Sequence, residues 1–231
     1  MKIVMLAAIV LPFAAVAEET RDFSLSVPAE DVERLQLESK VGQVVVRGAD
    51  IDVVEVRARL EPGDDEDWWG HGDDLRERLE KATLEQELDG ETLRLKLDYD
   101  DSGDADFEEH WEVRVPARLA LDLDMNVGEV RVEDTAGGVE SEVNVGSLDI
   151  DVREGDVTAN VNVGEVVIRN ATDGEGAIEL ESNIGDVRLS IDGESAGRTE
   201  GWLGSKVVFE GDGEDDVNAG VNVGEIRVDI R

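Results

Sequence analysis

The chain has 231 residues, no cysteine and a formal net charge of −36. A surface so acidic repels nucleic acid phosphates and anionic lipid headgroups, which excludes nucleic acid as a partner. Because disulfides are absent, the stability of the fold has to come from a packed core.

The first 17 residues have the pattern of a signal peptide. Lys2 provides a positive start, and the short apolar run that follows ends in the small residues Ala15 and Ala17. This run is shorter than the roughly 20 apolar residues of a membrane-spanning helix. We therefore expect residues 1–17 to be removed, and the mature chain to be exported to the periplasm or the medium without a membrane span.

Residues 18–119 contain the first copy of a pattern that recurs later in the chain. Apolar and polar side chains alternate from Leu35 to Val46, and the alternation shifts by one residue at Gly42. Alternation with period two is typical of a strand with one buried face, and a shift at glycine indicates a bend that turns the next strand inward. We expect this region to form the first coils and the N-terminal cap of a repeat structure, continuous with the part that follows.

An acidic insertion interrupts the N-terminal region at residues 61–74. It contains Trp68 and Trp69, which are candidate contact residues. A short helix with one apolar face is expected directly after the insertion. Residues 84–97 predict a hairpin, because Asp-Gly suits a tight turn between two alternating strands.

Residues 120–231 repeat a motif of asparagine, valine or isoleucine, and glycine, followed by alternating apolar residues. It occurs first at Asn126–Val132 and last at Asn222–Val228. The glycines from Gly128 onward are 18, 18, 21, 19 and 20 residues apart, which leaves no room for a helical crossover. The repetition predicts a parallel β-solenoid of the single-stranded β-helix type, with coils of about 18–21 residues. The predicted corner residues are Gly42, Gly128, Gly146, Gly164, Gly185, Gly204 and Gly224.

An antiparallel meander is the alternative arrangement. It places each repeat against a reversed neighbour, so it does not need the same residue at the same offset in every copy. A single coil also buries too little apolar surface to offset the entropy of ordering it, so the copies have to stack. In a solenoid Asp122 lies over Glu140, and the valine before each glycine, such as Val127, belongs to the inward apolar set.

The asparagines two residues before the corner glycines are expected to form a ladder on the outside of the coils. Hydrogen bonds between the amides of neighbouring coils stabilise such ladders, and we prefer this structural role to ligand binding. A degraded copy of the motif places Trp202 where an asparagine is expected, and this indole is either local packing or a contact residue. The predicted ladder consists of Asn126, Asn144, Asn162, Asn183 and Asn222.

Three segments follow one another in the middle of the chain: Val113–Pro116, Leu119–Leu123 and Val127–Val130. An earlier segment, Val41–Val46, has the same pattern of valines around a glycine as the third of them. Together they resemble the bacterial "putative adhesin" family of secreted β-helix domains. The resemblance covers nearly the whole mature chain. It implies an exported repeat domain, and it offers no catalytic residues to carry over.

Residues for catalysis are scarce in this sequence. His71 and His110 are its two histidines, and both lie in acidic segments close to tryptophans. A zinc site needs three or four convergent ligands; His71 with the aspartates after it could supply part of one, but exposed loop histidines are the preferred interpretation. We expect no catalytic residue, no cofactor and no metal site, with calcium held diffusely by acidic loops as the one ion left open.

These observations predict an exported, non-catalytic, adhesin-like binding or scaffolding protein of the bacterial envelope, whose partner is an unknown envelope or surface component. One alternative is a periplasmic envelope-stress or regulatory binding module. A second is a β-helical carbohydrate-active enzyme, which the acidic surface disfavours because it repels acidic sugars. The last coil ends at a complete unit, so we expect it to be an open end of the solenoid. Either the N-terminal segment folds back over this end, or two chains form a weak homodimer through it; we prefer a monomer whose end is partly covered.

Overall fold

The computed structural model describes residues 20–63, 72–100, 107–170, 175–199 and 204–230. Within these ranges the structure is all-β apart from one short helix. No helical segment in them has the length and hydropathy of a transmembrane span. The expectations for the signal peptide (residues 1–17), Trp68, Trp69, His71 and Trp202 fall outside the described residues.

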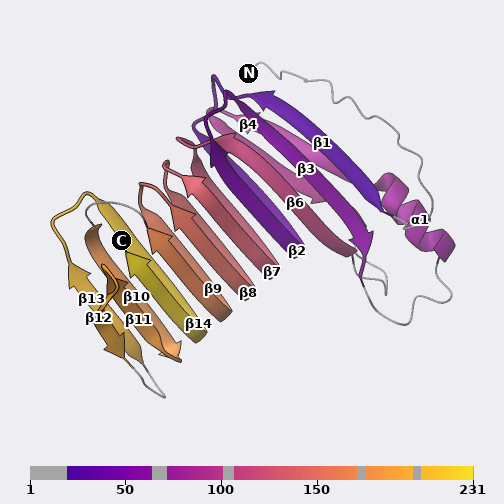
Figure 1. The fold of residues 1–231 in the computed structure, drawn as a ribbon. Coiled ribbons are helices and arrows are strands. Elements are labelled where there is room, and N and C mark those ends of the chain that lie inside the picture. The colour runs from indigo at the N-terminus through magenta and orange to yellow at the C-terminus, as the bar shows by residue number, and fades with distance from the viewer. Residues whose placement is uncertain (1–19, 64–71, 101–106, 171–174, 200–203, 231) are drawn as a thin grey trace.

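Figure 1 shows a long row of strands with the helix at its N-terminal end. The elements are β1 (Arg21–Pro28), β2 (Arg34–Ala49), β3 (Val53–Pro62), α1 (Gly72–Lys81), β4 (Thr83–Asp89), β5 (Thr92–Asp98), β6 (Phe107–Pro116), β7 (Ala120–Thr135), β8 (Val139–Val152), β9 (Val157–Asn170), β10 (Glu175–Ile184), β11 (Val187–Ile191), β12 (Glu194–Thr199), β13 (Ser205–Glu210) and β14 (Asp215–Ile230). The strands belong to one mixed, open sheet, whose main path is β1-β3-β6-β2-β7-β8-β9-β14-β10-β13.

Five long parallel strands, β2, β7, β8, β9 and β14, form the centre of the sheet and bend at a glycine near their middle. The pairing continues in register through the bend, so that Val127 pairs with Val145 and Gly128 with Gly146. Each strand therefore has a first arm before the glycine and a second arm after it. Both arms contribute to one core, in which Leu123 of a first arm is 1% exposed and Val132 of a second arm is 0% exposed.

The N-terminal end of the sheet has different neighbours on the two arms of β2. The first arm pairs with β5 of the β4–β5 hairpin. The second arm pairs with β6, which is followed by β3 and the edge strand β1. Helix α1 adds Leu75 and Leu79 to the core. The predicted helix and hairpin are thus both present, and Gly90 in the hairpin turn has a φ of 63°.

The C-terminal end of the sheet differs from the expected order of coils. Strand β14 lies between β9 and β10 and pairs in parallel with both, so the last unit of the chain is an inner strand. The expectation that this unit is the open end is wrong. The physical reason is that β13 pairs antiparallel with β10 and β12 pairs antiparallel with β11, so that these strands close the end of the sheet. The terminal repeat gains parallel partners on both sides instead.

Candidate functional site

Six of the seven predicted corner glycines form one column across the sheet. Their φ angles lie between 132° and 148°, a region that residues other than glycine rarely adopt. A Cβ atom on Gly146 would lie 1.8 Å from the carbonyl oxygen of Gly128, so there is also no space for one. In spatial order the column is Gly42, Gly128, Gly146, Gly164, Gly224 and Gly185.

Gly204 does not belong to this column, and the prediction that it forms a corner is wrong. Its φ is 72°, and a Cβ atom placed on it would have no neighbour within 4 Å. It precedes β13, in which Ser205 pairs antiparallel with Ser182 of β10. The degraded copy therefore adds a reversed strand to the sheet, and no neighbouring glycine carbonyl stacks on Gly204.

The five predicted ladder asparagines form one continuous chain of side-chain hydrogen bonds. Each Nδ2 donates to the Oδ1 of the next residue, at distances of 2.9–3.0 Å. Because β14 lies inside the sheet, Asn222 is the fourth residue of the ladder counted from Asn126, rather than the fifth. From donor end to acceptor end the order is Asn183, Asn222, Asn162, Asn144 and Asn126.

From Val127 onward, the residues directly before the corner glycines are exposed, contrary to the expectation that they point inward. Val127 is 38% exposed, and Val145 and Val163 are each 41% exposed. The chain turns from the first arm to the second at the following glycine, so the side chain before it lies on the outside of the bend. In-register pairing aligns these valines with Val223 and Ile184 in one apolar row beside the asparagine ladder.

A groove of about 880 Å³ follows the ladder along the outer face of the first arms. The ladder asparagines form one row of its lining, and acidic residues two positions earlier form a parallel row that includes Glu38, Asp124 and Glu142. Lys40 and Lys96 lie at the N-terminal end of the groove. The equivalent positions on β9 and β14 are Asn160 and Gly220, so the groove presents a continuous row of amides beside an acidic row that these two strands interrupt.

Two carboxyl groups on the first arm of β7 have perturbed pKa values: Asp124 of the acidic row, and Asp122 two residues before it. Burial raises the pKa of Asp122 and Asp124 above the usual carboxyl range. Like charges raise both pKa values further: the carboxylate of Glu140 acts on Asp122, and that of Asp122 acts on Asp124. As expected from the repeat, Asp122 pairs in register with Glu140. These two carboxyl groups therefore keep their protons to a higher pH than an isolated carboxyl group does, and a nearby cation would relieve the repulsion between them.

A buried carboxylate closes the N-terminal end of the groove. Glu109 of β6 is 1% exposed and accepts hydrogen bonds from Trp111 Nε1 at 2.7 Å, Tyr99 Oη at 2.8 Å and Ser39 Oγ at 3.0 Å. Its backbone occupies the place against Gly42 that the previous glycine occupies in the other strands. Glu109 is thus held by neutral donors and serves to join the cap to the first coil.

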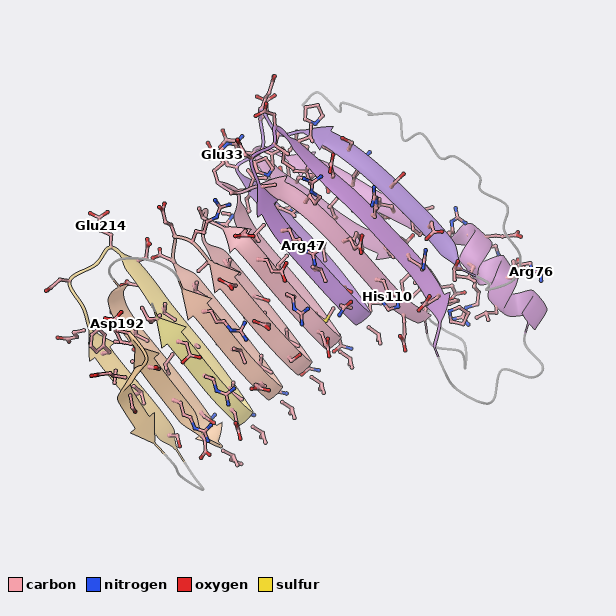
Figure 2. The ribbon with its side chains drawn as sticks, in the orientation of Figure 1. Glu33, Arg47, Arg76, His110, Asp192 and Glu214 are labelled. Carbon is pink, nitrogen blue, oxygen red and sulfur yellow. The ribbon has the colours of Figure 1, made fainter. Side chains whose placement is uncertain are left out.

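The outer face of the second arms is covered by paired charges. Figure 2 shows acidic and basic side chains projecting from these strands, with Arg47 among them. Arg47 of β2 forms an ion pair with Glu133 of β7 at 2.7 Å, and on the neighbouring strands β6 and β3 Arg114 forms one with Glu55 at 2.7 Å. Such exposed pairs contribute little to the stability of the fold, and we interpret this face as an ordinary solvated surface.

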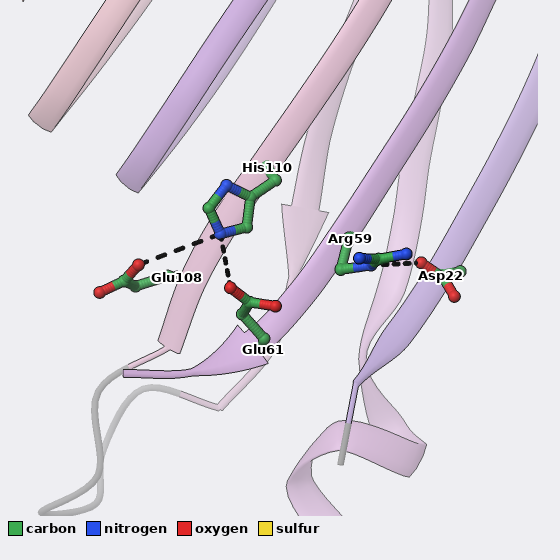
Figure 3. A network of polar contacts seen from close by, with 5 residues as sticks. All are labelled: Asp22, Arg59, Glu61, Glu108 and His110. Atoms are coloured by element: carbon green, nitrogen blue, oxygen red, sulfur yellow. Dashed lines mark hydrogen bonds and ion pairs between the residues drawn. The ribbon is translucent and has the colours of Figure 1, made fainter. Parts of the chain in front are cut away.

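A second polar cluster lies where β3 ends and β6 begins. Figure 3 shows Glu61 of β3 with Glu108 and His110 of β6. His110 Nε2 is 2.7 Å from Glu61 Oε1 and 4.0 Å from Glu108 Oε2. Beside them Arg59 pairs with Asp22 at 2.8 Å. The sequence predicted no metal site and did not indicate that these three residues lie together. Their one local signal is the pair Glu108 and His110 at alternate positions of a strand.

Comparison with known proteins supports the fold. No family model matches the chain, and no curated protein matches it. The crystal structure of a "putative cell adhesion protein" from Clostridium sporogenes is similar over 92% of this chain and 100% of the other, with a TM-score of 0.59 at 15% identity. A "putative adhesin" from Bacteroides fragilis matches over 90% of this chain and 97% of the other at 9% identity, but its TM-score of 0.22 is too low to inform the fold.

Proposed function

We propose that the chain is an exported, non-catalytic, adhesin-like protein that binds or scaffolds a component of the bacterial envelope through the groove. The observation that carries this proposal is the array of in-register side chains along the groove. The asparagine ladder repeats at the strand spacing of about 4.8 Å, and carboxylates lie beside it on β2, β7, β8 and β10. A surface that repeats suits a ligand that repeats, because each further strand adds a similar contact.

The proposal includes the finer points of fold and location. We infer that the bent strands form a parallel β-solenoid, and the columns of stacked glycines and asparagines support this description. The N-terminal sequence supports the removal of residues 1–17 and export to the periplasm or the medium. The name of the Clostridium protein agrees with an adhesive role, although the similarity to it concerns the fold.

The charges of the groove narrow the chemistry of its ligand. The carboxylates of Glu38, Asp124 and Glu142, together with those of Glu179 and Glu181, outnumber the two lysines in the lining. A polyanion would be repelled by this surface. A neutral or amino-bearing polymer rich in hydroxyl and amide groups would instead find hydrogen-bond partners along its length. We therefore propose an uncharged or cationic envelope polymer as the ligand.

Co-sedimentation with isolated cell-wall polymers tests this function. The purified chain is mixed with a neutral, an amino-bearing and an acidic polysaccharide, and the bound fraction is measured. Glu142→Lys reverses a charge inside the groove, whereas Asp151→Lys makes the same change on the second arm of the same strand. We expect binding to the first two polymers, a loss of at least about threefold with Glu142→Lys, and little change with Asp151→Lys.

Two outcomes would contradict the proposal. Absence of binding to all three polymers, or equal losses from the two lysine variants, would show that the groove is not the binding surface. Release of soluble sugars from any of the polymers would instead favour the carbohydrate-active enzyme.

A further inference from the structure

We propose that Glu61, Glu108 and His110 form a binding site for a transition-metal dication, for which Zn²⁺ is the reference ion. Each residue offers one ligand atom, and these atoms all lie within 4.8 Å of one another. This inference concerns the outer face of β3 and β6, and it is independent of the proposed function of the groove.

The pairing of two strands brings the three side chains together. Glu61 pairs with Glu108 in the antiparallel register of β3 and β6. His110 lies two residues after Glu108, and alternate residues of a strand project from the same face. All three side chains therefore point to one side of the two strands, as Figure 3 shows. Because the strands fix the backbone, the trio depends on no loop for its geometry.

The electrostatics of the trio favour a dication. Two carboxylates directly opposite each other in an antiparallel pair repel. An imidazolium between them supplies only one positive charge, whereas a bound dication supplies two. The net charge of −36 also raises the concentration of cations near the surface.

The donor types indicate the class of metal. One imidazole nitrogen and two carboxylate oxygens are donor types that Zn²⁺ accepts, and they equal in number the three protein ligands of open zinc sites, whereas Ca²⁺ and Mg²⁺ take oxygen ligands. The side chains are between 32% and 41% exposed. They can therefore move to the roughly 3.3 Å separation of donor atoms that follows from metal–ligand distances of about 2.0 Å.

The remaining coordination positions of the metal are open to solvent. A metal held by three protein ligands keeps at least one position for water or another ligand. Because the three side chains are only partly buried, an electron-pair donor on a molecule in solution would have access to that position.

Isothermal titration calorimetry with ZnCl₂ tests the site in the purified chain, with excess CaCl₂ present to occupy diffuse acidic sites. We expect a single saturable zinc site per chain. His110→Gln and Glu108→Gln should each weaken zinc binding by at least about tenfold. Glu112→Gln removes one charge from the same face of β6, and His71→Gln removes the other histidine; both should leave the affinity within about twofold. Thermal unfolding without metal checks that each variant is folded.

The two histidines provide a second readout that does not depend on affinity. Histidine-ring NMR signals are assigned to His110 by comparison with His71→Gln, and substoichiometric Zn²⁺ should shift the His110 signals first. The proposal is overturned if zinc shows no saturable binding, or if His110→Gln binds zinc as tightly as the unmodified chain. Equal losses from Glu108→Gln and Glu112→Gln would also overturn it, because binding would then reflect diffuse charge.

Discussion

Asn144 donates a hydrogen bond from Nδ2 to Oδ1 of Asn126 across 3.0 Å, between neighbouring strands at the outer edge of the groove. The same residue accepts one from Asn162, also at 3.0 Å. Asn144→Ala removes both bonds and leaves two amides to be solvated by water. Since a net hydrogen bond contributes about 0.5–1.5 kcal/mol, we expect the free energy of unfolding to fall by about 1–2 kcal/mol in urea denaturation.

Asn160→Ala is the matched control for the ladder. Asn160 is the same residue type, is exposed and lies two positions before Asn162 on β9, outside the chain of amide bonds. We expect it to lower the free energy of unfolding by less than about 0.5 kcal/mol. Equal costs for the two variants would show that the ladder contributes nothing beyond the solvation of exposed amides.

The corner column gives a sharper contrast between two glycines. Gly146→Ala places a Cβ 1.8 Å from the carbonyl oxygen of Gly128, and its φ of 144° is unfavourable for alanine as well. We expect a loss of more than about 2 kcal/mol, measured by thermal or urea unfolding. In Gly204→Ala the added Cβ meets no atom within 4 Å, so only the φ of 72° is unfavourable, and we expect the free energy of unfolding to fall by about 1 kcal/mol. A larger loss of stability from Gly204→Ala than from Gly146→Ala would contradict the assignment of the corner to Gly146.

The raised pKa values of Asp122 and Asp124 predict how the acidic row responds to pH. A carboxyl whose folded-state pKa is raised binds its proton more tightly when folded, so ionising it costs stability. That cost is present in full at neutral pH, decreases as the pH falls through the raised values, and is gone below the ordinary value of about 3.8. The double variant Asp122→Asn, Asp124→Asn should therefore be more stable than the parent chain at pH 7, by up to about 1 kcal/mol.

The variant's advantage should shrink as the pH is lowered from 7 towards 4, in melting temperatures recorded side by side. NaCl should reduce it as well, because salt screens the repulsion from Glu140 but does not relieve burial. Glu154→Gln in the exposed turn between β8 and β9 removes a charge far from this row and serves as the control. An advantage that stays constant from pH 7 to 4 would contradict the assignment.

The features that could be predicted from the sequence are those that depend on a fixed local offset. The asparagine two residues before each glycine and the glycine itself recur with the same spacing, so the ladder and the corner column follow from stacking alone. The alternation did not reveal that Val127 is exposed, because a bend changes the direction of the residue before it without changing the pattern. The cluster of Glu61 and His110 depends on an antiparallel pairing between strands 49 residues apart, for which the chain carries no local signal.

The position of β14 could not be predicted for a different reason. Each unit carries the same motif and offers the same edge to a neighbour, so Gly164 can stack equally well on the glycine of the next unit or of the last one. What decides the order is the antiparallel pairing of β13 with β10, which begins where the degraded copy loses its motif. Interchangeable parallel edges leave the order of strands to tertiary contacts.

Engineered cysteines distinguish the two orders directly, because the chain has no cysteine of its own. Glu165 pairs in register with Glu225 of β14, whereas Asp186 lies one strand further on, next to Glu225. In-register partners are about 4.8 Å apart, within the Cα separation of about 4.4–6.8 Å that a disulfide needs. Two strand spacings, about 9.6 Å, exceed that limit.

The pair Glu165→Cys, Glu225→Cys should therefore lose its free thiols on mild oxidation and migrate faster on a non-reducing gel. The pair Glu165→Cys, Asp186→Cys removes the same number of charges and should keep its thiols. A sheet in which the coils stack in sequence order would place Asp186 beside Glu165 and reverse both results. Since thiol counting needs only a folded chain, the outcome assigns the neighbour of β9 whatever the ligand of the groove is.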